Sequence, residues 1–584
     1  MQTEDRVSSN AAAYDARPWL AQYPADVPGS LNYPDISIWQ LLEQTLDGYG
    51  DHGAFVFQNN GMTFRQLRDQ AAAMAGALQR AGVKKGDAVL VLLPNIPHFP
   101  VTYFGTLRLG ARLAAVSPTS VEREIENLIE DSGARVVVTI DLLYDKVASV
   151  WERAGVETVV VGTVTDFMPA WKRLAAGWTG KTPKPKMPVE YGPRVQPMLS
   201  FMRGGKKEEV ATVVKSSDVA VLQYTGGTTG LPKAAMLTHG GLIANATQMK
   251  GLFPRLKDGQ ETILAVLPFF HVYGVTLVMN AGLLLAANTV LIARPVTMDI
   301  FEAVRRHRPT IFPGVPTLYV AVTNDRRHKD YDLSSIDVCC CGGAPLPLEV
   351  KREFERITGG HLYEGYGLSE ASPLTHSQPH KGESPAGSMG LPVPDTDARI
   401  VGDDDQPVPP GEEGELVVRG PQVMQGYWRR EQETAEALKG GWLHTGDIAR
   451  MDEDGWFYIV DRKKDLIITG GENIYPREVE EVLYEHPKVQ EAAVVGVPHP
   501  FGGEIAKAFI VLKPGEEATK KDITQFAAER LSKAKVPRAV EFRSELPKSA
   551  GLKILRRVLA EEERERQASQ PRRSRERSGP DPDA

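Results

Sequence analysis

The chain has 584 residues, of which 42% are hydrophobic and 24% are charged. This length is too great for one compact core, and the composition is that of an ordinary soluble protein, so we expect two or more domains. The formal net charge of -7 argues against nucleic acid as the main partner. The first residues contain no basic stretch followed by an apolar one, so we expect no signal peptide.

The first 82 residues predict a surface segment and then two helices. Residues 1–34 are polar and interrupted by prolines, which favours a segment that runs over the surface. Thr63 and Gln66 have the spacing of a capping box, and the helix that they begin is expected to run to Gly82. An earlier helix is indicated by one apolar face, formed by Ile38, Leu41, Leu42 and Leu46.

Three largely apolar runs follow and predict buried strands. They are residues 88–93, 135–140 and 158–161. Strands that are apolar on both faces are typical of parallel sheets covered by helices on each side. The pattern therefore predicts an α/β fold.

Residues 166–210 interrupt this pattern. Phe167, Trp171, Leu174 and Trp178 are spaced as on one helix face, and residues 170–207 contain nine Lys or Arg against one acid. An aromatic stripe beside a cationic segment could contact an anionic membrane surface, such as the inner face of the inner membrane. A surface insert whose aromatic side chains pack on the domain is the alternative that we favour.

A glycine- and threonine-rich loop predicts phosphate binding. It follows an apolar strand at residues 219–222 and reads Tyr-Thr-Gly-Gly-Thr-Thr-Gly-Leu-Pro-Lys-Ala over residues 224–234. Glycines let successive N–H groups point into one concavity, the threonines add hydroxyl donors, and Lys233 adds a positive charge. The loop is not a Walker A motif, because Pro232 precedes the lysine and Ala234 follows it.

Two further stretches predict buried structure and no membrane span. Residues 262–293 contain no charged side chain, but Pro268, His271 and Asn280 interrupt them, which favours a buried strand, loop and helix. The only cysteines, residues 339–341, are consecutive, and neighbours on a strand point to opposite faces. We therefore expect them to be buried thiols of a cytoplasmic protein.

Six more motifs complete the series. They are Leu-Pro-Phe-Phe-His-Val-Tyr-Gly (267–274), Cys-Gly-Gly-Ala-Pro-Leu-Pro (341–347), Tyr-Glu-Gly-Tyr-Gly-Leu-Ser-Glu (363–370), Gly-Trp-Leu-His-Thr-Gly-Asp (441–447), Asp-Arg-Lys-Lys-Asp (461–465) and Gly-Gly-Glu-Asn-Ile-Tyr-Pro (470–476). With the phosphate loop, they resemble the ordered motifs of adenylate-forming enzymes: acyl-CoA synthetases, luciferases and peptide adenylation domains. The resemblance covers roughly residues 35–558. The span from Trp442 to Lys464 resembles the signature of fatty-acyl-CoA synthetases.

The resemblance implies a nucleotide site with Mg²⁺. Tyr366 would stack on adenine, Asp447 and Arg462 would bind the ribose, and Glu370 and Thr228 would hold the metal ion on the phosphates. Ser369 stands where threonine is commoner. The residues implied to bind ATP or AMP are Thr225, Gly226, Gly227, Thr228, Thr229, Gly230, Gly343, Ala344, Pro345, Glu364, Gly365, Tyr366, Gly367, Ser369, Asp447, Ile459 and Arg462.

The resemblance also implies acyl, catalytic and CoA-side residues. The acyl group would lie against His271, Tyr273, Gly274 and Gly342. Lys553 would be the adenylation lysine, although Leu552 stands before it where the family normally has glycine, and His271, Lys233 and Glu370 would assist. Lys464 would be the hinge, with Gly470, Gly471 and Glu472 on the CoA side.

As a whole, the resemblance implies a long-chain fatty-acid–CoA ligase that uses ATP, Mg²⁺ and CoA. The expected architecture is a large domain (35–461) of parallel and mixed sheets covered by helices, with a barrel-like subdomain. A small mobile α+β domain (462–558) and a disordered tail (559–584) would follow. A medium-chain or aryl acid as substrate, a non-catalytic nucleotide- or lipid-binding relative, and a homodimer all stay open. A peptide adenylation module is disfavoured, since no carrier domain follows residue 560.

Overall fold

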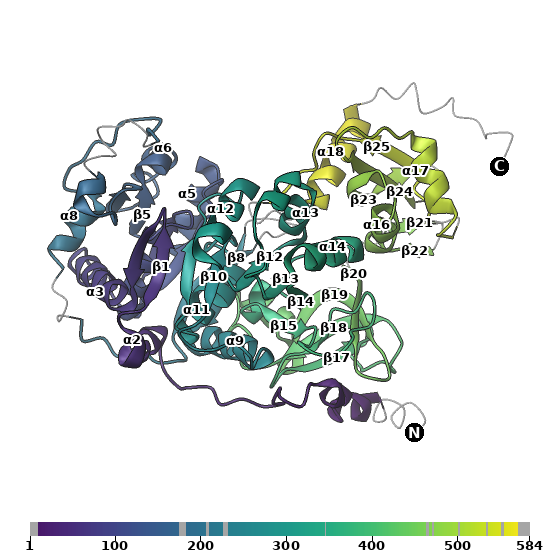
Figure 1. Cartoon of the computed structure of the whole chain (residues 1–584), viewed down its shortest axis with the longest axis horizontal. Helices are drawn as coiled ribbons and strands as arrows, with labels where there is room; N and C mark the ends of the chain where they lie inside the picture. The colour runs from purple at the N-terminus through teal and green to yellow at the C-terminus, as the bar shows by residue number, and fades with distance from the viewer. Residues whose placement is uncertain are drawn as a thin grey trace.

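Two large β-sheets, each built mainly of parallel strands, form the body of the chain (Figure 1). The computed structural model describes residues 10–173, 183–205, 210–225, 232–344, 346–462, 467–469, 472–499, 503–532, 535–549 and 554–569.

The first large sheet has seven strands in the order β7-β6-β5-β3-β4-β8-β9, and only β8 and β9 pair antiparallel. Alternate residues of the central strand β3 belong to different cores: Val89 and Val91 face one, and Leu90 and Leu92 face the other. This confirms the doubly buried strands expected from the apolar runs. The bounds are β3 Ala88–Leu92, β4 Arg112–Ala115, β5 Val136–Ile140, β6 Thr158–Gly162, β7 Val195–Pro197, β8 Val219–Thr225 and β9 Lys233–Thr238.

The second large sheet has nine strands in the order β16-β15-β14-β13-β12-β10-β11-β1-β2. Its centre, from β14 to β1, is parallel, and the edge strands pair antiparallel. The bounds are β1 Gly53–Phe57, β2 Asn60–Thr63, β10 Thr262–Ala265, β11 Asn288–Leu291, β12 Ile311–Gly314, β13 Val338–Cys341, β14 His361–Gly367, β15 Leu374–Ser377 and β16 Leu391–Pro392.

Helices fill the space between the two sheets and cover their outer faces. Among the inner helices, α3 contacts β1 of one sheet and α4 contacts β3 and β4 of the other. The inner helices are α2 Ile38–Tyr49, α3 Phe64–Arg80, α4 His98–Arg108, α9 His239–Leu252, the π-helix η3 Val275–Asn280 and α11 Ala281–Leu284. The outer ones are α5 Glu122–Ser132, α6 Tyr144–Ala148, α12 Thr297–His307, α13 Pro316–Asn324 and α14 Leu348–Thr358.

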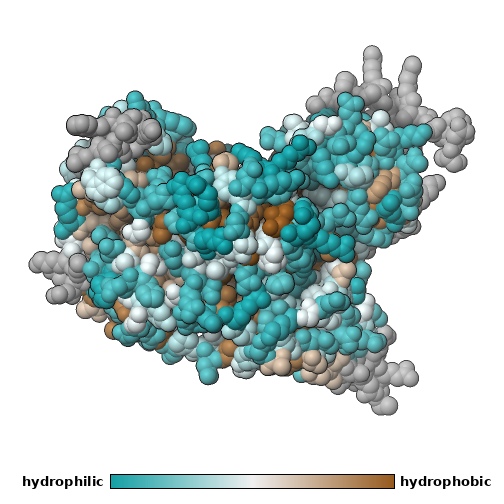
Figure 2. All heavy atoms as spheres, viewed as in Figure 1, coloured by the Kyte–Doolittle hydropathy of each residue, from teal (hydrophilic) through white to brown (hydrophobic). Residues whose placement is uncertain are grey.

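A four-stranded antiparallel sheet forms the subdomain expected to be barrel-like, and a separate α+β unit follows it. The first comprises β17 Asp397–Val401, β18 Gly414–Arg419, β19 Leu443–Met451 and β20 Phe457–Arg462. The second comprises β21 Ile467–Thr469, β22 Glu472–Ile474, α16 Pro476–Tyr484, β23 Val489–His499, β24 Gly503–Leu512, α17 Lys520–Ala528, β25 Ala539–Phe542 and α18 Arg556–Ser569. Drawn as spheres, the outline is notched between this small domain and the large one (Figure 2).

Several local expectations are confirmed. The capping box of Thr63 and Gln66 begins α3, which ends at Arg80, two residues before Gly82. The uncharged stretch forms β10, η3, α11 and β11, and no helix within the described ranges is long and apolar enough to cross a membrane. Cys339 and Cys341 are buried in β13, and all three thiols are free.

Other expectations need correction. The segment before residue 35 is anchored more firmly than a surface segment, because Tyr14 and Trp19 are each only 2% exposed. The tail does not begin at residue 559, since α18 continues to Ser569. In the insert, Phe167 packs edge-on against His98 as expected, but Trp171 is 67% exposed and does not pack on the domain. Leu174 and Trp178 lie outside the described residues.

Candidate active site

The phosphate loop connects two paired strands. β8 and β9 run antiparallel, with Thr225 opposite Lys233 in the register. The Thr225 hydroxyl donates to the Lys233 carbonyl across 3.3 Å. The pairing therefore fixes both ends of the loop, while residues 226–231, including Gly226, Gly227, Thr228, Thr229 and Gly230, lie outside the described residues.

Lys233 is held beside an aromatic ring and a carboxylate. Its Nζ lies 5.4 Å from the centre of the Tyr427 ring and 3.9 Å from Glu433 Oε1. The side chain is 34% exposed. The Lys233 amine thus lies near both an aromatic ring and a carboxylate, at the end of the glycine- and threonine-rich loop.

Glu370 lies in a single 3-10 turn, η5 Ser369–Ala371, just after β14. The Tyr427 hydroxyl donates to Glu370 Oε1 across 2.8 Å, and the Met424 amide donates to the Glu370 carbonyl, also across 2.8 Å. Both the backbone and one carboxylate oxygen are thus held by the segment around residue 427. The neighbouring Ser369 is half-buried.

Tyr366 and Asp447 meet directly, although 80 residues separate them in the chain. Tyr366 is on β14 and Asp447 is on β19, and the tyrosine hydroxyl donates to Asp447 Oδ2 across 2.6 Å. Asp447 is 6% exposed and lies opposite Arg462 of β20 in the register. The backbone therefore brings the expected adenine and ribose residues to one place, with Ile459 on the same strand as Arg462.

The turn after β13 lies beside β14. Cys341 pairs in register with Glu364, so the residues following each strand are neighbours. Gly343 has a φ of 85°, which an L side chain rarely adopts. A Cβ on Gly342 would lie 3.3 Å from the Gly365 carbonyl oxygen and equally near the Tyr273 ring, so a side chain at this position would crowd the turn.

Glycines and a buried acid shape the rest of β14. Burial raises the pKa of the Glu364 carboxyl, and the nearby Lys351 opposes that rise. A Cβ on Gly367 would meet the Pro373 carbonyl oxygen at 2.1 Å, and the glycine itself is exposed. Ala344 is also exposed, whereas Pro345 lies outside the described residues.

The expected acyl residues lie at the start of a helical run. His271 caps the short helix α10 Val272–Gly274, and its Nδ1 accepts from the Tyr273 amide. The Tyr273 hydroxyl donates to the Cys340 carbonyl across 2.8 Å, and burial raises its pKa well above the usual value. Gly274 passes the Pro268 carbonyl too closely for a side chain, since a Cβ would lie 2.3 Å from that oxygen.

The small domain touches this region through α16. Arg477 Nη1 donates to the Ile459 carbonyl across 2.9 Å, and the Tyr475 hydroxyl donates to Glu413 Oε2, also across 2.9 Å. Glu472 begins β22. Lys464, Gly470, Gly471 and Lys553 lie outside the described residues, so their roles stay predictions.

A magnesium ion fits this site only if phosphate oxygens are among its ligands. Among the described residues, no group of three or more His, Cys, Asp or Glu side chains could hold a metal ion. Mg²⁺ usually binds one or two carboxylates together with substrate phosphates and water. Glu370, a single oriented carboxylate near the phosphate loop lysine, suits that mode.

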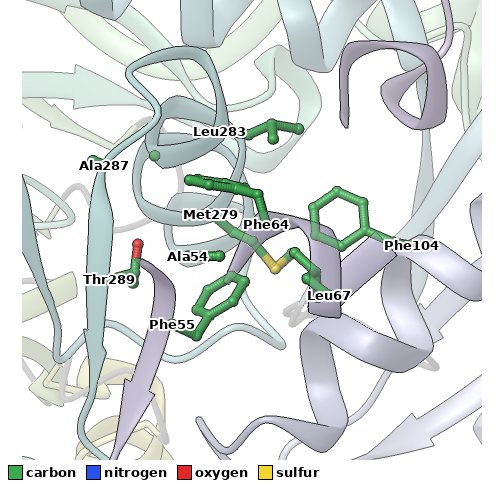
Figure 3. Close-up of a pocket in the computed structure, with 10 residues that line it drawn as sticks. Ala54, Phe55, Phe64, Leu67, Phe104, Met279, Leu283, Ala287 and Thr289 are labelled. Carbon is green, nitrogen blue, oxygen red and sulfur yellow. The ribbon is translucent and has the colours of Figure 1, made fainter. Parts of the chain in front are cut away.

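An apolar pocket between the two sheets is filled so closely by side chains that it has no room for a water molecule (Figure 3). The side chains of Phe55, Phe64, Phe104 and Met279 gather around it. Met279 lies on η3, in the helical run that begins beside His271. The pocket shares no lining residue with the expected acyl site, and its only polar side chain is that of Thr289.

Sequence reasoning missed Tyr427 and Glu433. Tyr427 lies 57 residues from Glu370, and Glu433 belongs to helix α15 Glu431–Ala437. Neither residue belongs to a sequence motif that predicts a binding or catalytic role. Only the folded chain brings them next to Lys233 and Glu370. A tyrosine next to Gly426 and Trp428 reads as ordinary packing.

Comparisons with known proteins cover almost the whole chain. A family model described as "AMP-binding enzyme" matches residues 42–428, and one described as "AMP-binding enzyme C-terminal domain" matches residues 478–553. A long-chain-fatty-acid–CoA ligase of Bacillus subtilis is 44% identical over 94% of this chain and 98% of its own length. One of Escherichia coli O6:H1 is 40% identical over the same shares. The solved structure of an anthranilate CoA ligase, AuaEII, in complex with anthranoyl-AMP has a TM-score of 0.82 at 26% identity and covers 92% of this chain and 99% of its own.

Proposed function

The chain belongs to the family of AMP-binding enzymes, and from this premise we infer that it is an ATP-dependent long-chain fatty-acid–CoA ligase. The observation that carries the proposal is the identity of 40–44% with long-chain-fatty-acid–CoA ligases over 94% of the chain, small domain included. Two groups of contacts support a nucleotide site where the motifs predict one. Tyr366 donates to Asp447, and Tyr427 contacts both Lys233 and Glu370.

The reaction has two half-reactions. In the first, a carboxylate oxygen of the fatty acid attacks the α-phosphorus of ATP, the bond to the bridging oxygen breaks, and pyrophosphate leaves. In the second, the CoA thiol loses its proton and attacks the acyl carbon, and AMP leaves with the former carboxylate oxygen. Free carboxylates are poor acyl donors because oxide is a poor leaving group, whereas AMP is a good one.

We assign roles to the site residues on this basis. Asp447, with its two acceptor oxygens, would hold the ribose hydroxyls, and Tyr366 would lie on the adenine. The phosphate loop and Lys233 would bind the phosphates, and Glu370 would hold Mg²⁺. When bound, Mg²⁺ neutralises phosphate charge and orients the leaving group. Lys553 would bridge the oxygens on which negative charge accumulates.

The experiment that tests the function is pyrophosphate release measured with ATP, Mg²⁺ and a series of acids. We expect saturated acids of long chain to give the largest kcat/KM, and CoA to convert the adenylate to thioester. A maximum with medium-chain acids or with an aryl acid would replace the long-chain assignment. Absence of pyrophosphate release with every acid would contradict the ligase activity and favour a non-catalytic relative.

We also propose that the chain around Trp171 contacts anionic lipid. Trp171 is 67% exposed, and Lys172 and Arg173 follow it directly. Interfacial tryptophans beside cationic side chains are typical of peripheral membrane contacts. Trp171→Ser should weaken binding of the full chain to anionic vesicles, and added salt should weaken wild-type binding. Val121→Ser, at another exposed apolar residue, is the control; equal effects of the two changes would contradict this proposal.

A further inference from the structure

The segment of residues 424–428, here called the clamp segment, joins two parts of the candidate site. The Met424 amide donates to the Glu370 carbonyl across 2.8 Å. On the other side, the Met236 amide donates to the Gly426 carbonyl across 2.9 Å, and the Trp428 amide donates to the Ala234 carbonyl across 2.8 Å. One short stretch of backbone thus connects the turn that carries Glu370 to β9, the strand that leaves the phosphate loop.

The side chain of Tyr427 repeats this connection. Its hydroxyl donates to Glu370 Oε1 across 2.8 Å, and the centre of its ring lies 5.4 Å from Lys233 Nζ. Its own amide donates to Thr434 Oγ1 across 2.8 Å, which ties the tyrosine to α15. Burial, together with the Glu370 carboxylate, raises the pKa of the phenol, so the hydroxyl stays a donor at neutral pH.

We propose that Tyr427 is a positioning residue. Its hydroxyl holds the Glu370 carboxylate in the orientation that would bind Mg²⁺, and its ring keeps the Lys233 side chain at a fixed place relative to that carboxylate. The proposal rests on the function proposed above. A glutamate side chain has several rotatable bonds, and fixing it costs conformational entropy at the moment when metal binds. A hydrogen bond to one oxygen fixes the side chain beforehand, and the carboxylate would then hold the metal ion without further ordering.

Tyr427→Phe tests the proposal because it removes only the hydroxyl. The readout that needs no turnover is binding of Mn²⁺, as a paramagnetic substitute for Mg²⁺, together with the non-reacting analogue α,β-methylene-ATP. We expect Mn²⁺ affinity in the ternary complex to fall about tenfold, the effect of one hydrogen bond to a charged group. Affinity for the analogue without metal should change less than about twofold, because the ring beside Lys233 remains.

Activity should follow the same pattern. In pyrophosphate release by Tyr427→Phe, the half-saturating Mg²⁺ concentration should rise about tenfold, as for metal binding. The rate at saturating Mg²⁺ should approach the wild-type rate. A general loss of packing would instead lower the rate at every Mg²⁺ concentration, with an unchanged midpoint.

Trp428→Phe is the matched control. The Trp428 indole donates to the Asp131 carbonyl across 3.0 Å, in a hydrogen bond that does not involve Glu370. This change also deletes one hydrogen bond and keeps an aromatic ring, but it should leave the Mn²⁺ affinity unchanged. An equal shift in the two variants would overturn the proposal, because the effect would then come from disturbing the segment.

A double-mutant cycle with Glu370→Gln gives the decisive result. If Tyr427 acts through Glu370, then Tyr427→Phe should change Mn²⁺ affinity less than about twofold once Glu370 is glutamine. Additive effects would overturn the proposal. A wild-type chain that binds Mn²⁺ and the analogue but forms no acyl-adenylate with any acid would contradict the proposed ligase function, and the binding cycle would still decide the role of Tyr427.

Discussion

At the scale of single residues, the site is held by a few long-range hydrogen bonds to charged groups. Tyr366 donates to Asp447 and Tyr427 donates to Glu370, so in each pair a neutral hydroxyl orients an acidic side chain. Hydrogen bonds to ionised acceptors are shorter and stronger than those between neutral groups. Two carboxylates at the proposed nucleotide site are therefore oriented before any substrate binds.

Glu370→Gln should lower the rate of adenylation by roughly two to three orders of magnitude, as expected when an electrostatic stabiliser of phosphoryl chemistry is lost. The amide keeps the shape of the side chain and can still accept from Tyr427, but it has no charge for Mg²⁺. Pyrophosphate release at saturating fatty acid measures the effect. Glu431→Gln, an exposed acid at the start of α15, is the control. An unchanged rate in Glu370→Gln would remove this residue from the site.

At the scale of elements, α18 is an integral part of the small domain. Leu559 is fully buried against β23 and β24, in a cluster with Val495 and Phe509. Glu563 Oε1 lies 2.7 Å from Lys507 Nζ, and both side chains are at most 10% exposed. A sequence rich in Glu and Arg is thus held against the sheet by a buried leucine and by ion pairs such as that of Glu563 with Lys507.

Leu559→Ala should destabilise the small domain by about 2–5 kcal/mol, the usual cost of truncating a buried leucine to alanine. Thermal unfolding of the full chain should show the small-domain transition at a lower Tm. Glu565→Ala, an exposed residue of the same helix, should leave that Tm unchanged. Equal Tm values for wild type and Leu559→Ala would mean that α18 does not contribute to the core.

At the scale of the whole molecule, the two domains meet next to the proposed nucleotide site. Arg477 and Tyr475 of the small domain hydrogen-bond to the Ile459 carbonyl and to Glu413 of the large domain. Both of these contacts are polar, as is typical of interfaces between domains that move relative to one another. An enzyme with two half-reactions can use such motion to present different residues in turn, with Lys464 as the proposed hinge.

Lys553→Ala should abolish formation of acyl-adenylate but still convert supplied acyl-adenylate and CoA to thioester, because the charge that the lysine stabilises exists only during adenylation. Gly471→Leu should do the reverse, since a side chain there would crowd the approach of the CoA thiol. Single-turnover assays of each half-reaction measure this. The residue before Lys553 is Leu552, where the family normally has glycine. Leu552→Gly restores that glycine and should raise the adenylation rate if the leucine hampers the loop that carries Lys553. Equal loss of both half-reactions in a folded Lys553→Ala protein would contradict the two-conformation mechanism.

The sequence by itself determined the fold class and the order of the motifs. Apolar runs such as residues 88–93 identify doubly buried strands, because a parallel sheet needs apolar side chains on both faces. Local signals also predicted the start of α3, since a capping box depends only on residues three apart. The motif series indicated an acyl-CoA synthetase, and the family match together with the 40–44% identity to CoA ligases confirms it.

Only the tertiary structure decided which side chains hold the motif residues in place. Tyr427 meets Glu370, and Tyr366 meets Asp447, across separations that no local pattern encodes. The residues of α18 have the composition of a charged tail, and only the structure shows Leu559 and Glu563 packed against the sheet. The helical spacing of Trp171 predicted that it packs on the domain, but the side chain is largely exposed. Periodicity reports which face of an element is apolar, whereas the partner of that face is set by the packing of distant segments.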